Sequence, residues 1–474
     1  MESANHFERK LSQIMDSGSS THENDPVKRQ KENNEGEDRI SKLPDCIISR
    51  TTKEAVRTSV LSKEWINNWR SITSLHLDDI DMVYGRTKHI EHECFERFMY
   101  RSLLLTNSRL DNFSLSIHDH HDMFNLNEWI YGALRKFPKK LCIKSQRKLS
   151  FAFSTAHSLF TSQSLQELEI YMSYCYANIT VPRSRVHLGQ LKFLTLHEVK
   201  FSCSDKDPEL SLPLLQKIKT VNCIWLGVRC VTFNVPLLET IDITQHTNSS
   251  WLEGNCKIKF RALHLKEFCL CDYGYLSSYL TMIDPSSAQN ASATLILPPY
   301  ERGVSSTVEH GALELLKQFS QVRYLKFGGP DVLAQEVILL PEFGMLRHLE
   351  LDSVTGEFLL ALLLKTPILN TLVVERLKSE YYKALLKSAV VPDCLRHTLQ
   401  VVNFRDVCGD KHELHFAKFF MEKGSVLKRM SFSLSHLFVK SEAIEELEQK
   451  LSGLKKCLTS TIVEVLKEDY YNSW

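Results

Sequence analysis

The hexad Leu346-Arg-His-Leu-Glu-Leu351 is the sequence feature that most restricts how this chain folds. Its spacing places Leu349 and Leu351 on one side of an extended segment, with Leu346 at the start of that segment. Hexads of the same spacing begin at Val322 and Leu369, so neighbouring copies are separated by steps of 24 and 23 residues. A single strand of this kind cannot bury its apolar side alone, and the recurrence therefore predicts a stack of similar strands.

Further copies of the hexad cover most of the chain. Clear copies begin at Leu165, Leu191, Leu215, Leu238 and Leu265, weaker ones begin at Leu110, Pro138 and Ser292, and two later ones begin at Leu399 and Leu427. A period of roughly 20 to 29 residues is typical of leucine-rich repeats. We therefore expect residues 71–388 to form a leucine-rich-repeat solenoid with a parallel sheet on its concave side and helices or loops outside. Leu194, Leu349 and Leu372 should be buried in it.

The side chains that alternate with the buried positions of each hexad are predicted to face away from the core, where they form a surface for a partner. This surface is charged at Glu167 and Glu169 and at Lys140 and Lys144. Tyrosine supplies large contact area at binding sites, and two tyrosines follow a predicted strand. We expect target contacts from this set: Lys217, Lys219, His348, Glu350, Tyr273 and Tyr275.

Charge and hydropathy exclude some partners. The 58 Lys and Arg residues nearly balance the 57 Asp and Glu residues, so the basic surface that nucleic-acid binding requires is absent and no nucleic-acid partner is expected. The longest apolar run covers Phe358 to Leu364, far short of the roughly 20 residues that span a bilayer, so no membrane partner is expected either. The first ten residues hold no apolar core of a secretory signal, and we expect a nuclear or cytoplasmic protein.

Two groups of residues have the chemistry of ligands or reactive groups. His118-Asp-His-His-Asp122 suits either a metal ion or a polar loop, and we favour the loop because no second ligand pair has a recognisable spacing. Cys269 and Cys271 would lie on the same strand face as Glu267, as half-buried thiols or as a redox or metal pair. No phosphate-binding loop, zinc-hydrolase motif or nucleophile motif is present, so we expect no enzyme activity, cofactor or metal.

Residues 38–70 carry a second pattern, beginning at Leu43-Pro44-Asp45 and continuing through Thr52 to Trp65. Pro and an acid suit the first turn of a helix, and Thr52 suits the cap of a second helix. The stretch resembles the F-box of plant F-box proteins, which docks on the SKP-type adaptor of an SCF (SKP, cullin, F-box) ubiquitin ligase. The resemblance implies adaptor contacts from its apolar residues and prolines: Leu43, Pro44, Ile47, Ile48, Val56, Val60, Leu61 and Trp65.

The F-box stretch is shorter than its relatives. Members of that family carry an apolar segment of the type Ile-Leu-Ser-Phe-Leu-Pro between the equivalents of Arg50 and Thr52, where this chain has only Thr51. Losing about six residues removes roughly one and a half helical turns. Two hypotheses therefore remain, a substrate receptor that docks on the adaptor and a repeat protein whose F-box no longer does so.

The C-terminal part resembles the FBD domain that ends many plant F-box/LRR proteins, through Val391-Pro-Asp-Cys-Leu395, Val402-Asn-Phe404 and the segment Glu413–Phe420. Leu414, Ala417, Phe420 and Met421 would cover the end of the solenoid, and residues 442–466 have a helical period. We thus expect an α/β protein: a disordered tail (1–37), a small helical F-box (38–70), leucine-rich repeats (71–388) and an FBD domain with a C-terminal helix (389–474). The resemblance implies a non-catalytic subunit of an SCF-type ubiquitin ligase that selects the target protein.

Overall fold

The computed structural model describes residues 73–80, 88–106, 109–182, 186–246, 256–272, 288, 290–297, 306–329, 333, 337–378, 390–409, 411–434, 449 and 462–466. These residues belong to two compact units. Unit 1 extends to residue 206 and includes 210–214 and 223–228. Unit 2 holds residues 207–209, 215–222 and everything from 229 onward. The predicted F-box contacts lie outside the described residues.

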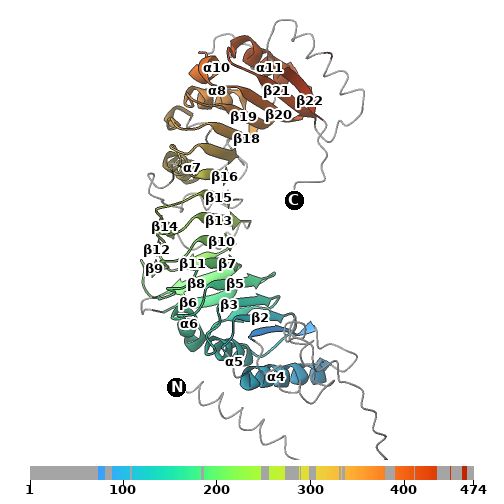
Figure 1. Ribbon diagram of the computed structural model, residues 1–474, viewed down its shortest axis with the longest axis vertical. Coiled ribbons are helices and arrows are strands. Elements are labelled where there is room, and N and C mark those ends of the chain that lie inside the picture. Colours follow the sequence, from blue (N-terminus) through green and yellow to red (C-terminus); the bar gives the residue numbers. More distant parts are fainter. Residues whose placement is uncertain are drawn as a thin grey trace, which may run out of the picture. The chain divides into compact units, whose positions relative to one another are not determined.

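Unit 1 is built on a parallel sheet of strand order β1-β2-β3-β5-β7, with helices along one side of it (Figure 1). Its sheet strands are β1 (Ser74–Asp78), β2 (Asn112–Ile117), β3 (Lys140–Ser145), β5 (Glu167–Met172) and β7 (Phe193–His197). Its helices are α4 (Lys88–Leu105), α5 (Met123–Leu134) and α6 (Phe153–Phe160). A small sheet combines β4 (Leu149–Ser150), β6 (Ala177–Val181), β8 (Val199–Cys203) and β11 (Ile224–Leu226).

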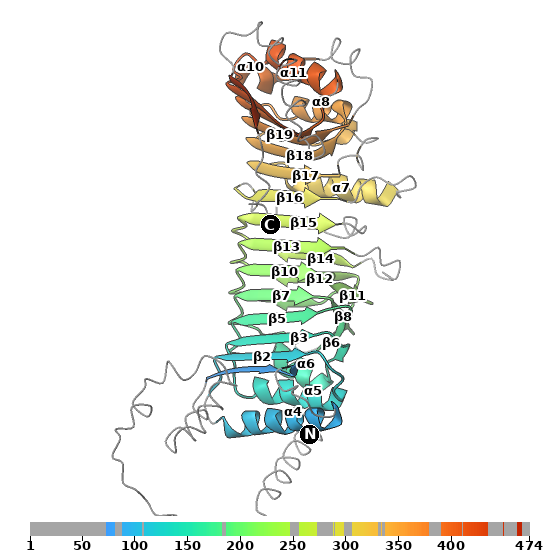
Figure 2. The same cartoon turned by 90° about the vertical axis from the view of Figure 1, so that its right-hand side faces the viewer.

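Unit 2 has a longer parallel sheet of order β10-β13-β15-β16-β17-β18-β19-β20-β21-β22 (Figure 2). Its strands are β10 (Lys217–Val221), β13 (Thr240–Gln245), β15 (Glu267–Asp272), β16 (Ser292–Ile296), β17 (Tyr324–Gly328), β18 (His348–Val354), β19 (Thr371–Leu377), β20 (Val401–Val407), β21 (Arg429–Leu434) and β22 (Ile462–Leu466). Its helices are α7 (Ser306–Gln318), α8 (Gly356–Leu364), α10 (Asp393–His397), α11 (Lys411–Lys423) and the 3-10 helix η6 (Val337–Leu339). Two short strands, β12 (Cys230–Asn234) and β14 (Lys257–Arg261), pair behind the sheet, and β9 (Glu209–Ser211) lies where the chain passes between the units.

The hexads stack in the register that their spacing predicts, with one exception. The predicted register was wrong by two residues for the weak copy at Ser292, where Ala293 and not Leu295 pairs with Phe268 and Leu325. Leu349 pairs with Leu325 on one side and with Leu372 on the other, and all three side chains are fully buried. Leu194 in unit 1 is buried as well, with 8% of its surface exposed. Equivalent residues of successive repeats therefore form continuous apolar columns, which is the packing that makes a repeat stable only beside its neighbours. The predicted leucine-rich-repeat fold is confirmed.

One backbone contact recurs where the sheet strands begin. The carbonyl oxygen of Arg323 accepts hydrogen bonds from the N–H groups of Arg347 and His348, at 2.9 and 3.0 Å. The carbonyl of Arg347 accepts in the same way from Asn370 and Thr371. The equivalent contact is made by the carbonyls of Thr73, Asp111, Lys139, Gln166, Gln216, Glu239, Asn370 and Gln400. Each repeat thus fixes the register of the next, and this aligns the outward-facing side chains.

The segments opposite the main sheets are not only helices and loops, as the sequence predicted. Ala177–Val181 and Val199–Cys203 form the paired strands β6 and β8, and Cys230–Asn234 pairs with Lys257–Arg261. Apolar residues alternate with polar ones in these segments, and the alternating residues of β6 and β12 are buried. The prediction of helices or loops was wrong here, because these short runs have the period of two that is typical of a strand.

The C-terminal part continues the sheet of unit 2, since Val402 and Phe404 of β20 pair with Leu372 and Val374 of β19. Three of the predicted α11 core residues, Ala417, Phe420 and Met421, are buried. Leu414 is only half-buried, and Glu413 is buried beside it because its carboxylate accepts hydrogen bonds from the backbone N–H groups of residues 408 and 409. The helical period predicted up to Leu466 was wrong at its end, where β22 pairs with β21.

The apolar run Phe358–Leu364 forms most of α8, whose Thr355 side chain caps the helix by accepting from the backbone N–H of Phe358. Six of its nine residues are buried, as expected of a segment that packs behind the sheet. Among the described residues, no helix combines the length and the apolar character that crossing a membrane requires.

Candidate functional site

The open face of the unit 2 sheet is the side opposite α7, α8 and α11, and its side chains form straight rows across the strands. The pairing register places Lys217 beside Thr240, then Glu267, Ser292, Tyr324 and His348 in one row, which we call row A. The next row, row B, contains Lys219, Asp242, Cys269, Thr294, Lys326 and Glu350. Four predicted target contacts therefore belong to two continuous lines on one surface.

The predicted residues Lys217 and Lys219 differ in their surroundings. Lys217 is exposed and makes no ion pair with any described residue. Lys219 is half-buried, and its Nζ lies 3.1 Å from Oδ2 of Asp242 on the neighbouring strand. Lys217 therefore offers an uncompensated charge to a partner, whereas much of the charge of Lys219 is neutralised within the sheet.

His348 and Glu350 are brought together, as their spacing of two on a strand predicts. His348 Nε2 lies 3.0 Å from Glu350 Oε1, and the Tyr324 ring stacks on His348 with 4.8 Å between centroids. Burial would raise the pKa of Glu350, but hydrogen bonds from His348 and Tyr324 lower it below its usual range. Burial, followed by the hydrogen bond and charge of Glu350, raises the pKa of Tyr324 to about 12. These contacts thus favour the ionised form of the Glu350 carboxyl group and the neutral form of the Tyr324 hydroxyl group.

Two cations lie near this group, Lys326 on β17 and Arg405 on β20. Lys326 Nζ lies 3.8 Å from Glu350 and 3.7 Å from Glu375, and an Arg405 nitrogen lies 3.7 Å from Glu375. We call Tyr324, Lys326, His348, Glu350, Glu375 and Arg405 the β17–β20 network. It combines an aromatic pair with charges of both signs, the combination that recurs at protein recognition surfaces. Sequence reasoning missed Tyr324, Lys326, Glu375 and Arg405, although the steps of the hexads place Tyr324 next to His348.

Unit 1 has a comparable open face. Lys140 bridges Glu167 and Glu169 at 3.0 and 2.8 Å, and these contacts raise its pKa. Lys144 lies over the Tyr171 ring, which packs on His197 with 4.7 Å between centroids. A shallow cavity of about 360 Å³ opens there and is lined by Ile117, His118, Lys144, Ser145, Gln146, Glu169, Tyr171 and Ser173.

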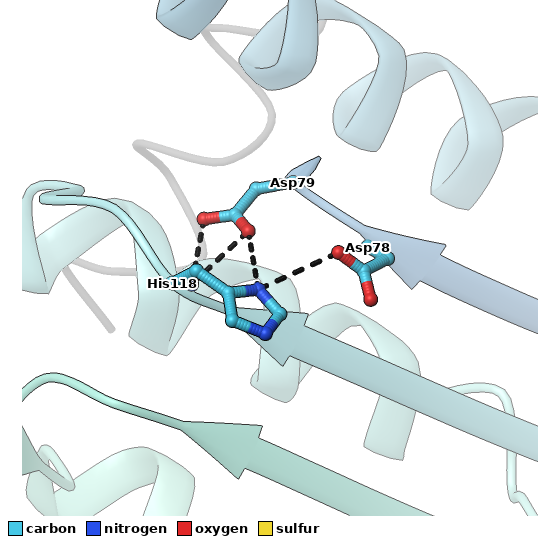
Figure 3. A group of neighbouring side chains, drawn as sticks. All are labelled: Asp78, Asp79 and His118. Atoms are coloured by element: carbon cyan, nitrogen blue, oxygen red, sulfur yellow. Dashed lines mark hydrogen bonds and ion pairs between the residues drawn. The ribbon is translucent and has the colours of Figure 1, made fainter. Parts of the chain in front are cut away.

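The His118–Asp122 cluster forms a polar loop, as favoured, and it is tied to the end of β1 (Figure 3). The buried Asp79 carboxylate accepts hydrogen bonds from the backbone N–H groups of His118 and Asp119, at 2.8 and 2.9 Å. The His118 ring adds a contact at 2.9 Å and His121 adds one at 3.3 Å. Asp78, Asp79 and His118 are close enough to hold a cation. The oxygens of Asp79 already face N–H donors, however, so the geometry is that of a loop anchor.

Replacing Asp79 by Ala should lower the free energy of unfolding by about 2–4 kcal/mol, because the buried loop donors lose their acceptor. Burial would raise the pKa of Asp79, but the hydrogen bonds from His121, Asp119 and His118 lower it far below its usual range. A lowered folded pKa stabilises the protein fully above the unfolded pKa of about 3.9 and progressively less as the pH falls below it. Asp79→Asn should therefore weaken the acid sensitivity of unfolding between about pH 5 and pH 3.

Urea unfolding of the variants at several pH values measures this effect. Asp78→Ala is the matched control, since the Asp78 side chain is 38% exposed and lies 3.5 Å from the His118 ring. Asp78→Ala should lower the free energy of unfolding by less than about 1 kcal/mol. Equal losses for the two alanine variants would contradict the anchoring role of Asp79.

The remaining predicted site residues divide into two groups. Cys269 and Cys271 face the open side together with Glu267, as predicted. Tyr273 and Tyr275 lie outside the described residues, and so do the eight predicted adaptor contacts.

Comparison with known proteins matches the C-terminal part to the family model FBD over residues 387–432, which contains β20, α11 and most of β21. An F-box/FBD/LRR-repeat protein of Arabidopsis thaliana is 26% identical, covering 82% of this chain and 87% of the relative. An F-box protein of the same plant is 25% identical, covering 83% and 86%. An F-box/LRR-repeat protein is 25% identical, covering 91% and 89%. The FBD match, the repeat sheets and these relatives together make the chain similar to plant F-box/FBD/LRR-repeat proteins.

Proposed function

We propose that this protein is a substrate-recognition subunit of an SCF-type E3 ubiquitin ligase and acts in the nucleus or the cytoplasm. Residues 38–70 would dock on an SKP-type adaptor, and the open faces of the repeat sheets would hold the target protein. The subunit performs no covalent chemistry itself. It raises the effective concentration of the target beside the conjugating enzyme that the complex carries.

The observation that carries this proposal is the set of polar, charged and aromatic side chains in rows A and B on the open sheet face of unit 2. Each residue of these rows is fixed by the register of its strand, so the surface is organised before a partner arrives. Lysines alternate with acidic residues along row B, with Cys269 and Thr294 between the two pairs, and such patterns select partners by charge complementarity. The similarity to F-box proteins supports the link from a binding surface to ubiquitination.

A second candidate function is a protein-interaction module that holds its partner without delivering it to the ligase. The observation that favours it is the short F-box, in which Thr51 alone stands where relatives carry about six residues. Removing an apolar turn from the docking helix lowers the apolar area available for the adaptor.

Titration of the purified full chain with an SKP-type adaptor distinguishes these two functions. If the chain is a substrate receptor, its binding to the adaptor should be saturable. Leu61→Asp should abolish that binding, because a buried carboxylate would face the adaptor's apolar surface. Leu263→Asp is the matched control, since Leu263 is an exposed leucine of unit 2 with 62% of its surface accessible. Absence of binding at high adaptor concentration would overturn the receptor and leave the interaction module.

Reversing charge at Lys217 should weaken target binding about tenfold or more, which corresponds to about 1.4 kcal/mol. The free energy of unfolding should change by less than about 0.5 kcal/mol, because Lys217 is exposed. Adding Lys219→Glu should lower the free energy of unfolding by a further ~0.2–1 kcal/mol, since the new carboxylate lies opposite Asp242. Quantitative capture of cellular proteins on each variant, with urea unfolding alongside, measures both effects.

Lys257→Glu with Lys259→Glu is the matched control for the double reversal. These two exposed lysines have the same spacing on β14, which pairs behind the main sheet and not on its open face. They should leave partner capture unchanged. Unchanged capture by the Lys217 and Lys219 variants would remove rows A and B from target recognition.

A further inference from the structure

Two cysteine thiols meet on the open face of unit 2. Cys269 and Cys271 are alternate residues of β15, both are half-buried, and their Sγ atoms are 3.8 Å apart. The intervening Leu270 and the flanking Phe268 are buried on the opposite side. Since β15 is paired with β13 on one side and β16 on the other, the backbone that carries both thiols is fixed.

The separation of the two sulfur atoms matches a chelate. Two thiolates bound tetrahedrally to one ion lie about 3.8 Å apart when each metal–sulfur bond is about 2.3 Å long, the value for zinc. A disulfide would instead require the sulfurs to approach to about 2.05 Å. The observed geometry thus needs little rearrangement to hold a cation and a larger one to form a disulfide.

Charged groups of the neighbouring strands lie near the thiols. Asp242 of row B is opposite Cys269 in the pairing register, and its carboxylate is paired with Lys219 at 3.1 Å. The thiolate is the form of a cysteine that binds metal.

We propose that Cys269 and Cys271 form a binding site for a thiophilic divalent cation of the zinc and cadmium class. Binding replaces two S–H bonds by two metal–sulfur bonds and releases two protons to solvent. The remaining coordination positions face the open side of the sheet, where water completes them. Soft thiolate ligands select such ions over magnesium or calcium. The site is independent of whether the F-box docks on an adaptor.

Titration of the reduced full chain with Cd²⁺, followed by thiolate-to-cadmium absorption and by equilibrium dialysis, tests the site. The native chain should bind one more ion per molecule with high affinity than the Cys269→Ser, Cys271→Ser double variant. Each single variant should weaken binding of that ion by about 100-fold or more, since loss of an outer-shell partner alone costs roughly 10–100-fold. Zn²⁺ should displace the ion competitively.

Cys175→Ser is the matched control, because Cys175 is a half-buried thiol that donates to the backbone carbonyl oxygen of Ser173. The Cys175→Ser variant should bind Cd²⁺ with the same stoichiometry and affinity as the native chain. Identical Cd²⁺ stoichiometry and affinity for the native chain and the double variant would overturn the site. If a serine variant fails to fold, alkylation of the native chain decides: Cd²⁺ should protect Cys269 and Cys271 but not Cys175, and equal alkylation of all three would overturn the proposal.

Discussion

Insertion of Ile-Leu-Ser-Phe-Leu-Pro after Arg50 should tighten binding to an SKP-type adaptor by several powers of ten. Burial of a Leu, Ile or Phe side chain stabilises a contact by roughly 1.5–3 kcal/mol, and the native chain lacks about three of them. Every 1.4 kcal/mol or so corresponds to a tenfold change in affinity. Titration calorimetry of the native and extended chains with the same adaptor measures the difference.

An insertion of six polar residues, Ser-Asn-Ser-Asn-Gly-Ser, is the matched control for length. It restores the number of residues without the apolar surface and should not tighten binding. Equal and tight binding by the native and extended chains would contradict the predicted deficit and would mean that the second helix suffices. Binding by neither chain would favour the uncoupled interaction module.

Leu349→Ala should lower the free energy of unfolding by about 2–5 kcal/mol. Leu349 is fully buried between Leu325 and Leu372, so truncation leaves a cavity in an apolar column that two neighbouring repeats share. Urea unfolding of the full chain measures the loss. Leu263→Ala, at an exposed leucine of unit 2, should cost less than about 0.5 kcal/mol. A cost that small for Leu349→Ala would contradict the repeat register.

The hexads predicted the main sheets because two periods coincide in them. A side-chain period of two decides which residues of a strand are buried, and the repeat, which has 23 to 27 residues between the clear copies, decides which strands are neighbours. Leu325, Leu349 and Leu372 were therefore placed correctly from spacing alone. The same two periods predicted that His348 and Glu350 would share the open face, which the structure confirms.

Features that depend on contacts between distant polar groups could not be predicted in the same way. Asp79 meets His118 because β1 and β2 end side by side, but its preference for N–H donors over a cation follows from atomic positions. Glu413 is buried only because two backbone N–H groups of the preceding turn face it. The strands β6, β8, β12 and β14 were missed for a different reason, since their short alternating runs were outweighed by the expectation of helices.

We propose that target binding by the repeats is coupled to ubiquitination, and this coupling can be measured in plant cells. Proteins captured by the full chain in plant cells are compared with those captured by a chain lacking residues 38–70, and their attached ubiquitin and their half-lives are quantified. The receptor predicts that both chains capture the same partners, and that only the full chain increases their ubiquitin and shortens their half-lives. Equal ubiquitin and equal half-lives with both chains would contradict the claim.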